Sequence, residues 1–336
     1  MTNIFKSRAF RITAGLIVTG FALWLSFRKV DWILLRDTFL HVNLFWVALA
    51  VLNSLITVYA LGIRWQILLN PEKKVSLFEL FRLNIICQCV NIIVPARLGE
   101  VLRAYLVSKR HKISGAYAMG TIVIEKVFDF FTFLAFWILV PPLLAVKEQL
   151  KGYKLALIFC FLMFLIIFIL IWKREGVLKL GKKLSLLVPR KYRERFIDFF
   201  DRSLNAFNML KSFKTLLLLL FLSLLFVGSM ILTNYFLFLA FGLELSVWVA
   251  LFLILALQVG SIPPSSPGKV GIFEYMVILS LALFAVPKSE ALSYGLLLHA
   301  VSYLPKILLG LIFISQLDIS LKKKYHLNEN ETVSTK

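Results

Sequence analysis

The chain has 336 residues, 60% of them hydrophobic and 17% charged, with a formal net charge of +20. A soluble domain has about 45–50% apolar and about 25% charged residues, so this composition excludes an ordinary soluble protein. The basic residues gather at the ends of apolar runs, as on the cytoplasmic face of a membrane protein. No nucleic-acid motif accompanies them, and we expect no nucleic-acid partner.

The first part of the chain, residues 1–172, is expected to form one membrane half. Its long apolar runs cover residues 10–27, 44–63, 117–146 and 155–172. A helix needs about 20 apolar residues to cross about 30 Å of hydrocarbon, so these runs predict full spans. The first run is short, but no small residues follow it at a cleavage position, which favours a retained span over a signal peptide.

A shorter apolar pair, residues 75–94 and 98–107, follows the second span. Because basic residues flank both of its ends, charge parity requires the pair to start and finish in the cytoplasm. Its second arm is too short to cross the bilayer. We therefore predict a re-entrant hairpin around 75–110 that turns at Pro95, although two tilted spans would also satisfy the parity.

A basic connector, residues 173–213, separates the two membrane halves. Apolar side chains recur in it at helical spacing among the charges, at Ile197, Phe200, Leu204 and Phe207. This pattern predicts an amphipathic helix on the cytoplasmic surface of the membrane.

The second membrane half, residues 214–321, shows the mirrored pattern. Its spans are predicted over 216–243 and 291–317, and between them a hairpin around 247–286 must start and finish on the outer side. We therefore predict an all-α polytopic membrane protein with about six full spans and two re-entrant hairpins of opposed orientation, as in an inverted repeat. The protein is expected in the plasma (cytoplasmic) membrane, with both termini in the cytoplasm and a disordered tail over 322–336.

Each predicted hairpin turns at a Pro/Gly-rich break that carries one cation. Pro95 and Pro267 suit the first turn of a helix, so each predicts a half-helix whose N-terminus lies at membrane depth. Such a terminus carries partial positive charge and favours an anion. Arg97 and Lys269 add a full positive charge to each first turn, which is unfavourable unless a carboxylate or a phosphate offsets it.

The candidate site residues fall into three groups around these breaks. For binding an anionic headgroup we predict Arg97, Arg103 and Lys269. For charge balance or proton coupling we predict Glu100, Glu125, Asp129 and Glu274. Backbone turns are assigned to Pro95, Gly99, Pro267, Gly268 and Gly271. The alternative is that these ions only neutralise one another and stabilise the turns.

Two polar stripes accompany the breaks. Asn84, Gln88 and Asn91 share one helix face before the first break, where they either bond another helix or line a water-accessible groove. In the last span, a second stripe at helical spacing consists of His299, Ser302, Tyr303 and Lys306. We expect this stripe to face the protein interior, and we assign His299 no proton relay.

The sequence shows no catalytic, metal or cofactor motif. Cys87, Cys89 and Cys160 lie in apolar segments without metal-ligand spacing. The largest polar segment is too short to bury a core of its own, which a soluble catalytic domain would need. We therefore expect neither enzyme activity nor a cofactor.

Four ordered motifs resemble the lysylphosphatidylglycerol synthase transmembrane family over residues 10–317. They are Pro95-x-Arg97-x-Gly99-Glu100-x-x-Arg103, Glu125-Lys126-x-x-Asp129, Ser266-Pro267-Gly268-x-x-Gly271-x-x-Glu274 and Pro305-x-x-x-x-Gly310. The chain departs from the family pattern in three places, with Lys126 where Arg is usual, Lys269 where Gly is common and His299 where Arg is expected.

The resemblance implies a polytopic helical domain with re-entrant segments that moves lipids between leaflets. Some relatives are fused to an aminoacyl-transferase that modifies phosphatidylglycerol. These residues include no such domain, so we expect no lipid lysylation. Relatives are also linked with polyprenyl-phosphate sugars and hopanoids, which leaves the cargo open.

We therefore expect a flippase or scramblase-like translocase for a lipid with an anionic headgroup, of the phospholipid or polyprenyl-phosphate type. One alternative is a membrane-embedded transferase that acts on a lipid-linked substrate with Glu125 or Asp129 as base, although no donor-binding motif supports it. The other is an accessory membrane subunit that holds a soluble partner enzyme through the basic connector.

Overall fold

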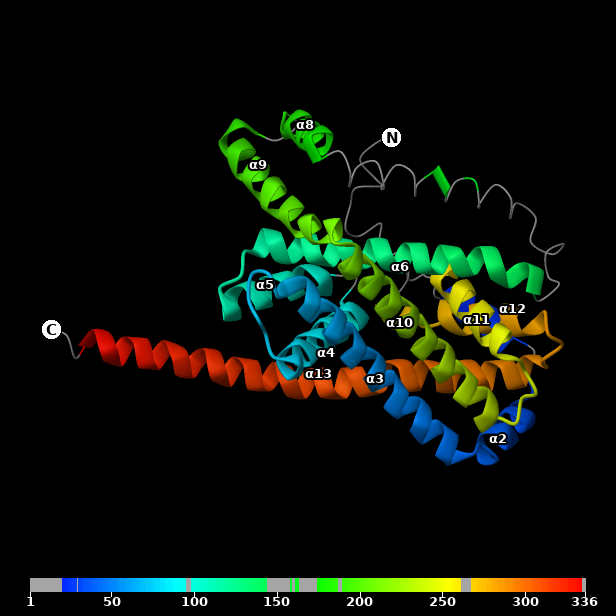
Figure 1. Cartoon of the computed structure of the whole chain (residues 1–336). Coiled ribbons are helices and arrows are strands. Elements are labelled where there is room, and N and C mark those ends of the chain that lie inside the picture. Colours follow the sequence, from blue (N-terminus) through cyan, green and yellow to red (C-terminus); the bar gives the residue numbers. More distant parts are fainter. Residues whose placement is uncertain are drawn as a thin grey trace, which may run out of the picture.

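The computed structural model describes residues 20–28, 30–94, 98–143, 158, 161–162, 174–186, 189–260 and 267–333. Within these ranges all regular structure is helical (Figure 1), which confirms the predicted all-α class. A helical fold suits a bilayer, because the hydrocarbon core holds no water to bond free backbone groups.

The helices are named in chain order. The first half contains α2 (Trp32–Leu40), α3 (Leu44–Leu69), α4 (Leu77–Ile93), α5 (Gly99–His111) and α6 (Gly115–Leu143). The connector contains α8 (Arg174–Ser185), α9 (Arg190–Asn205) and the 3₁₀ helix η2 (Ala206–Lys211). The second half contains α10 (Phe213–Ala240), α11 (Val247–Gly260), the 3₁₀ helix η3 (Pro267–Lys269), α12 (Ile272–Ala282) and α13 (Lys288–Val333).

The same order of helix lengths occurs in both halves. Helices α3 to α6 have 26, 17, 13 and 29 residues, and α10 to α13 have 28, 14, 11 and 46. Each half therefore contains a long helix, two short ones and another long one. The first long helix begins at a polar N-cap in both cases, Asn43 before α3 and Ser212 before α10. Such a cap bonds an N–H group that the helix leaves free.

Helices α3 and α10 pack side by side in antiparallel directions (Figure 1). The backbone N–H of Asn43, at the start of α3, donates to the carbonyl of Ala240, at the end of α10, over 2.9 Å. Further along, the hydroxyls of Thr57 and Ser229 lie 2.6 Å apart. These polar groups bond each other across the helix contact, as interhelical polar groups in membranes do.

Helix α13 passes α3 and α4 and contains a proline in its interior (Figure 1). Pro305 has no N–H to donate, so the carbonyl of Val301, four residues earlier, loses its partner within the helix. The hydroxyl of Ser54 in α3 donates to this carbonyl over 3.4 Å. The neighbouring helix therefore supplies the hydrogen bond that the proline removes.

Helices α13 and α4 approach closely where Gly310 faces Cys89. A methyl group at Gly310 would lie 2.9 Å from the Cys89 Sγ and closer still to its Cβ. We expect Gly310→Ala to lower the free energy of unfolding by about 1–3 kcal/mol, the usual cost of overpacking. The midpoint of thermal unfolding in detergent measures this loss.

The control for Gly310→Ala is Gly295→Ala on the same helix. The nearest atoms to a methyl group there are Cβ and Cγ1 of Val277 at 3.3 Å, a much milder contact than the one at Gly310, so the loss of stability should be smaller. An equal loss in both variants would contradict the close approach of α13 to α4.

The connector docks on the first half through α9. The hydroxyl of Ser203 donates to the carbonyl of Ala116 in α6 over 2.9 Å. Phe200 lies against Gly181 of α8, so the two connector helices also contact each other. Figure 1 shows α8 and α9 on the side of α6 that faces away from α13.

Three described segments are long and apolar enough to cross a membrane: α3, α10 and residues Lys288–Leu317 of α13. These helices support an integral membrane protein, while the number of spans and the re-entrant geometry stay predictions. The predicted spans over 10–27 and 155–172 fall largely outside the described residues. Helix α13 continues to Val333, through residues for which we predicted a disordered tail, because no Pro or Gly interrupts that stretch.

Candidate functional site

Four ionised side chains form a buried cluster where α3, α5 and α6 meet. This ion cluster consists of Arg64, Arg103, Glu125 and Asp129. Arg64 and Glu125 are each 1% exposed, and Arg103 is 3% exposed. Charged side chains are almost never buried this far unless they are paired, so the packing of the three helices depends on the pairs.

Glu125 holds Arg103 with both of its carboxylate oxygens. Arg103 Nη1 donates to Oε2 over 2.5 Å, and Nη2 donates to Oε1 over 3.2 Å. The Arg103 guanidinium also lies 3.8 Å from the ring centroid of Trp65, whose indole N–H donates to Thr121 over 3.0 Å. Because the bidentate pair and the stacked ring both fix the guanidinium plane, Arg103 is held in one orientation.

Arg64 connects the ion cluster to the second half. Its Nη1 donates to Asp129 Oδ1 over 2.6 Å and to the hydroxyl of Ser223 in α10 over 2.9 Å. Its Nε lies 3.7 Å from Glu125 Oε1. Two guanidinium groups thus face two carboxylates, and the four charges of the cluster balance.

The ion cluster has a more exposed edge at Lys126 and Glu100. The Lys126 Nζ lies 3.2 Å from Glu100 Oε1 and 3.9 Å from Asp129 Oδ2, and the lysine side chain is 53% exposed. Glu100 lies three residues before Arg103 on α5, yet Arg103 pairs with Glu125 and Glu100 with Lys126. The neighbouring α6 offers a buried bidentate partner, which binds more strongly than a solvated pair along one helix.

Helices α4 and α5 meet at the first break. The side-chain oxygen of Asn91 accepts a hydrogen bond from the backbone N–H of Gly99 over 2.7 Å, so α4 caps the start of α5. A side chain at Gly99 would overlap the carbonyl oxygen of Cys87 in α4, so this approach requires glycine. Residues 95–97 lie outside the described residues, and the roles of Pro95 and Arg97 stay predictions.

The second break, which begins with Pro267, turns through left-handed backbone. The φ angle is +70° at Gly268, +57° at Lys269 and +87° at Gly271. Glycine adopts such angles freely, whereas a residue with a Cβ loses about 1–2 kcal/mol there. Lys269 therefore occupies a position where the backbone favours glycine.

Glu274 ties the start of α12 to α13. Its Oε2 accepts a hydrogen bond from the backbone N–H of Gly271 over 2.7 Å, and its Oε1 lies 2.5 Å from His299 Nδ1. The His299 ring packs against Phe273 and Tyr303, with centroids 4.5 and 4.4 Å away. Glu274 is 2% exposed, and each of its oxygens has a partner, the backbone N–H before a helix start and an imidazole nitrogen.

A cavity of about 200 Å³, the inner cavity, opens beside this pair between α10, α11, α12 and α13. Its polar lining consists of Asn234, Gln258, Lys269, Ser302, Tyr303 and Lys306. Its other lining residues are Met230, Ile254, Leu257, Gly260, Ile272, Phe273, Met276 and Leu298. Among the described residues, the lining includes two lysines and no carboxylate, so its charge favours an anion. The second polar stripe predicted from the sequence contributes three of these side chains.

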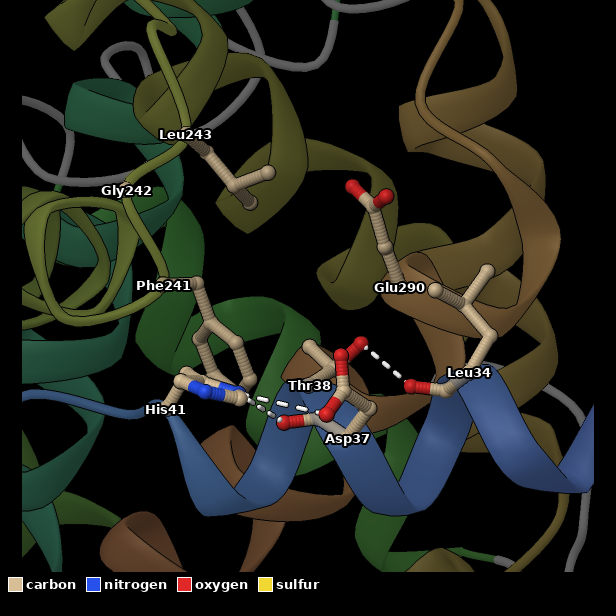
Figure 2. Close-up of a pocket in the computed structure, with 8 residues that line it drawn as sticks. All are labelled: Leu34, Asp37, Thr38, His41, Phe241, Gly242, Leu243 and Glu290. Carbon is tan, nitrogen blue, oxygen red and sulfur yellow. Dashed lines mark hydrogen bonds and ion pairs between the residues drawn. The ribbon is translucent and has the colours of Figure 1, made fainter.

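A second cavity, of about 310 Å³, lies at α2 and is shown in Figure 2. Asp37 comes from α2 and His41 follows its end, with the His41 Nδ1 3.4 Å from Asp37 Oδ1, and Glu290 comes from α13. This lining has two carboxylates and no lysine or arginine, so its charge disfavours an anionic headgroup. The inner cavity is therefore the better candidate for one.

Sequence reasoning missed two contributors to these sites. Arg64 was not among the predicted site residues, yet it joins the ion cluster to α10. The available signal was a cation inside an apolar run, which in a membrane defaults to an interior role. Gln258 of the inner cavity gave a weaker signal, as a lone polar residue near the end of an apolar helix.

Over residues 12–310 the chain matches the protein family described as the lysylphosphatidylglycerol synthase TM region. It is similar to UPF0104 membrane protein MJ1078 of Methanocaldococcus jannaschii, with 32% identity over 228 residues that cover 66% of this chain and 92% of the relative. UPF0104 membrane protein MJ1595 of the same organism is 26% identical over 334 residues, 96% of this chain and 98% of the relative. No solved structure matches the chain.

Proposed function

Because this chain belongs to the lysylphosphatidylglycerol synthase TM region family, as its motifs predicted, we propose that it is an integral membrane translocase for lipids with an anionic headgroup. The apolar helices and the family support a membrane protein with a lipid-related role. Beyond this role we propose that the protein exchanges lipids between leaflets, that its cargo is anionic and that it lies in the plasma membrane.

The first support is that each pair of short helices returns to the side on which it began. Arg110 at the end of α5 pairs with Glu79 at the start of α4 over 2.9 Å. Phe284, just after α12, packs against Phe252 near the start of α11, with centroids 5.7 Å apart. We take both pairs as re-entrant hairpins. Since α3 and α10 are antiparallel, we place the hairpins on opposite faces, as in an inverted repeat.

The second support is a motif shared by the two breaks. Pro95-x-Arg97-x-Gly99 and Pro267-x-Lys269-x-Gly271 have the same spacing, and each directly precedes the second short helix of its half. The motif puts one cation and the free N–H groups of a helix start at the same point of both hairpins. Lys269 has a positive φ angle, which is unfavourable for a residue with a side chain, and residues at functional sites often have such strained angles.

The proposal gives the ion cluster and the breaks different roles. Arg97 and Lys269 contact the headgroup phosphate, and Glu274 balances charge at the second break. Arg103 is occupied by Glu125, so it positions α5 against α6 rather than contacting lipid. Glu100, Glu125 and Asp129 balance the cations around it.

The observation that carries the proposal is a cationic, polar cavity enclosed by apolar helices at the second of two like breaks. Irregular backbone and charged side chains are tolerated in a bilayer only where protein buries them or where they line a water-filled cavity. A phosphate-bearing headgroup is the membrane component whose charge matches such a cavity.

We expect proteoliposomes with the purified chain to move fluorescent phosphatidylglycerol between leaflets faster than protein-free liposomes. The measurement is the fraction of label that a membrane-impermeant reductant reaches over time. Lys269→Gln is expected to slow this exchange about tenfold, because it removes one charge-assisted contact.

The matched control is Lys211→Gln, which removes an exposed lysine of the connector and should leave the rate unchanged. Equal rates with and without protein, for anionic, zwitterionic and polyprenyl-phosphate lipids alike, would refute translocation. Faster exchange of zwitterionic lipid alone would refute the anionic cargo.

A further inference from the structure

The part of the inner cavity lining that the structure describes carries positive charge and contains no carboxylate. Lys269 enters it from η3 and Lys306 from α13. Glu274 follows Phe273 of the lining directly, but its two oxygens face Gly271 and His299. Both oxygens of the Glu274 carboxylate are thus already in contact with other groups.

Lys306 is a lining residue whose positive charge has no counter-charge among the described residues. No ion pair or hydrogen bond joins its ammonium to another described residue. Ser302 and Tyr303 precede it by about one helical turn, lie on the same face of α13 and line the same cavity. A lysine inside an apolar helix is retained where it faces a cavity or a partner, which points to an occupant with negative charge.

The size of the inner cavity limits that occupant. Its volume of about 200 Å³ is smaller than the roughly 300–1,000 Å³ of sites for drug-sized ligands, so a headgroup fits and a whole diacyl lipid does not. Leu257, Phe273 and Met276 give it an apolar side as well. A phosphate attached to an apolar chain matches both parts of the lining.

We propose that the inner cavity is the headgroup-binding site of the second half and that Lys306 is the counter-charge to the lipid phosphate. This rests on the proposed function, because it names the part of the molecule that holds the cargo. Lys306 is a binding residue that the predicted set of Arg97, Arg103 and Lys269 does not include. The ligand chemistry is an anionic phosphate, carried by a lipid rather than free in solution.

Native mass spectrometry of the full chain in non-ionic detergent tests this site. The probes are dioleoyl phosphatidylglycerol, dioleoyl phosphatidylcholine and inorganic phosphate. Wild-type protein is expected to retain phosphatidylglycerol, and Lys306→Met to bind it about tenfold more weakly, the factor for one charge-assisted contact. Lys306→Arg and the exposed Lys211→Met should bind like wild type.

Unchanged affinity in Lys306→Met would overturn the proposal. Equal retention of phosphatidylcholine would overturn the anionic headgroup, and displacement of the lipid by equimolar inorganic phosphate would overturn the lipid source. If Lys306→Met does not fold, Ser302→Leu fills the cavity without removing a charge and must abolish retention by itself; retained lipid overturns the site.

The binding assay and the exchange assay test the proposed site and the proposed function separately. Wild-type protein that retains phosphatidylglycerol through Lys306 but does not speed exchange keeps this site and refutes the proposed function. Exchange that persists at the wild-type rate in Lys306→Met keeps the proposed function and refutes this site.

Discussion

Replacing Glu125 by alanine is expected to lower the free energy of unfolding by about 3–5 kcal/mol, which is the usual loss when one partner of a buried ion pair is removed. The variant leaves the guanidinium groups of Arg103 and Arg64 buried, with Asp129 as the one carboxylate of the ion cluster. The midpoint of thermal unfolding in detergent is the measurement, and the variant should unfold well below wild type.

The control for this prediction is Asp198→Ala, which breaks an ion pair with Arg202 on α9. Both side chains of that pair are more than half exposed, so the loss should stay within about 1 kcal/mol. If Glu125→Ala were as stable as Asp198→Ala, the ion cluster would not hold α3, α5 and α6 together.

Replacing Gly99 by alanine is expected to open the contact between α4 and α5. The added methyl group would overlap the backbone oxygen of Cys87 and lie 2.6 Å from the side-chain oxygen of Asn91. A backbone oxygen cannot move away by changing rotamer, so we expect a loss at or above about 3 kcal/mol, the upper end of overpacking costs. Lipid exchange should fall with stability, because the first break depends on this contact.

Gly228→Ala in α10 is the matched control for Gly99→Ala. A methyl group there meets no described atom within 4 Å, and alanine is the better helix former by about 0.5–1 kcal/mol. The two alanine variants should therefore move the unfolding midpoint in opposite directions. A neutral Gly99→Ala would show that α5 does not start against α4.

The sequence alone was enough for the fold class and for the positions of the two breaks. Long apolar runs have few alternatives to membrane helices, and Pro and Gly mark where such helices stop. It also placed the polar stripe of α13 in the interior, where Ser302, Tyr303 and Lys306 line the inner cavity.

The choice of ion-pair partners could not be predicted in the same way. Glu100 lies only three residues from Arg103, but the partner of Arg103 is Glu125, 22 residues away on α6. Likewise, Glu274 pairs with His299, 25 residues later in the chain. Such pairs depend on how helices pack in three dimensions, and the periodicity of one helix does not contain that information.

In the proposed translocase, the two breaks are accessible from opposite faces of the membrane. Leu98 and Val270 directly precede Gly99 and Gly271 at matched positions of the two breaks, and both are exposed on the protein surface. In a chain without its native cysteines, each position is replaced singly by cysteine and treated with a membrane-impermeant thiol reagent in sealed, oriented vesicles. We expect labelling of Leu98→Cys from the cytoplasmic side and of Val270→Cys from the outer side. Labelling of both from the same side would contradict this arrangement.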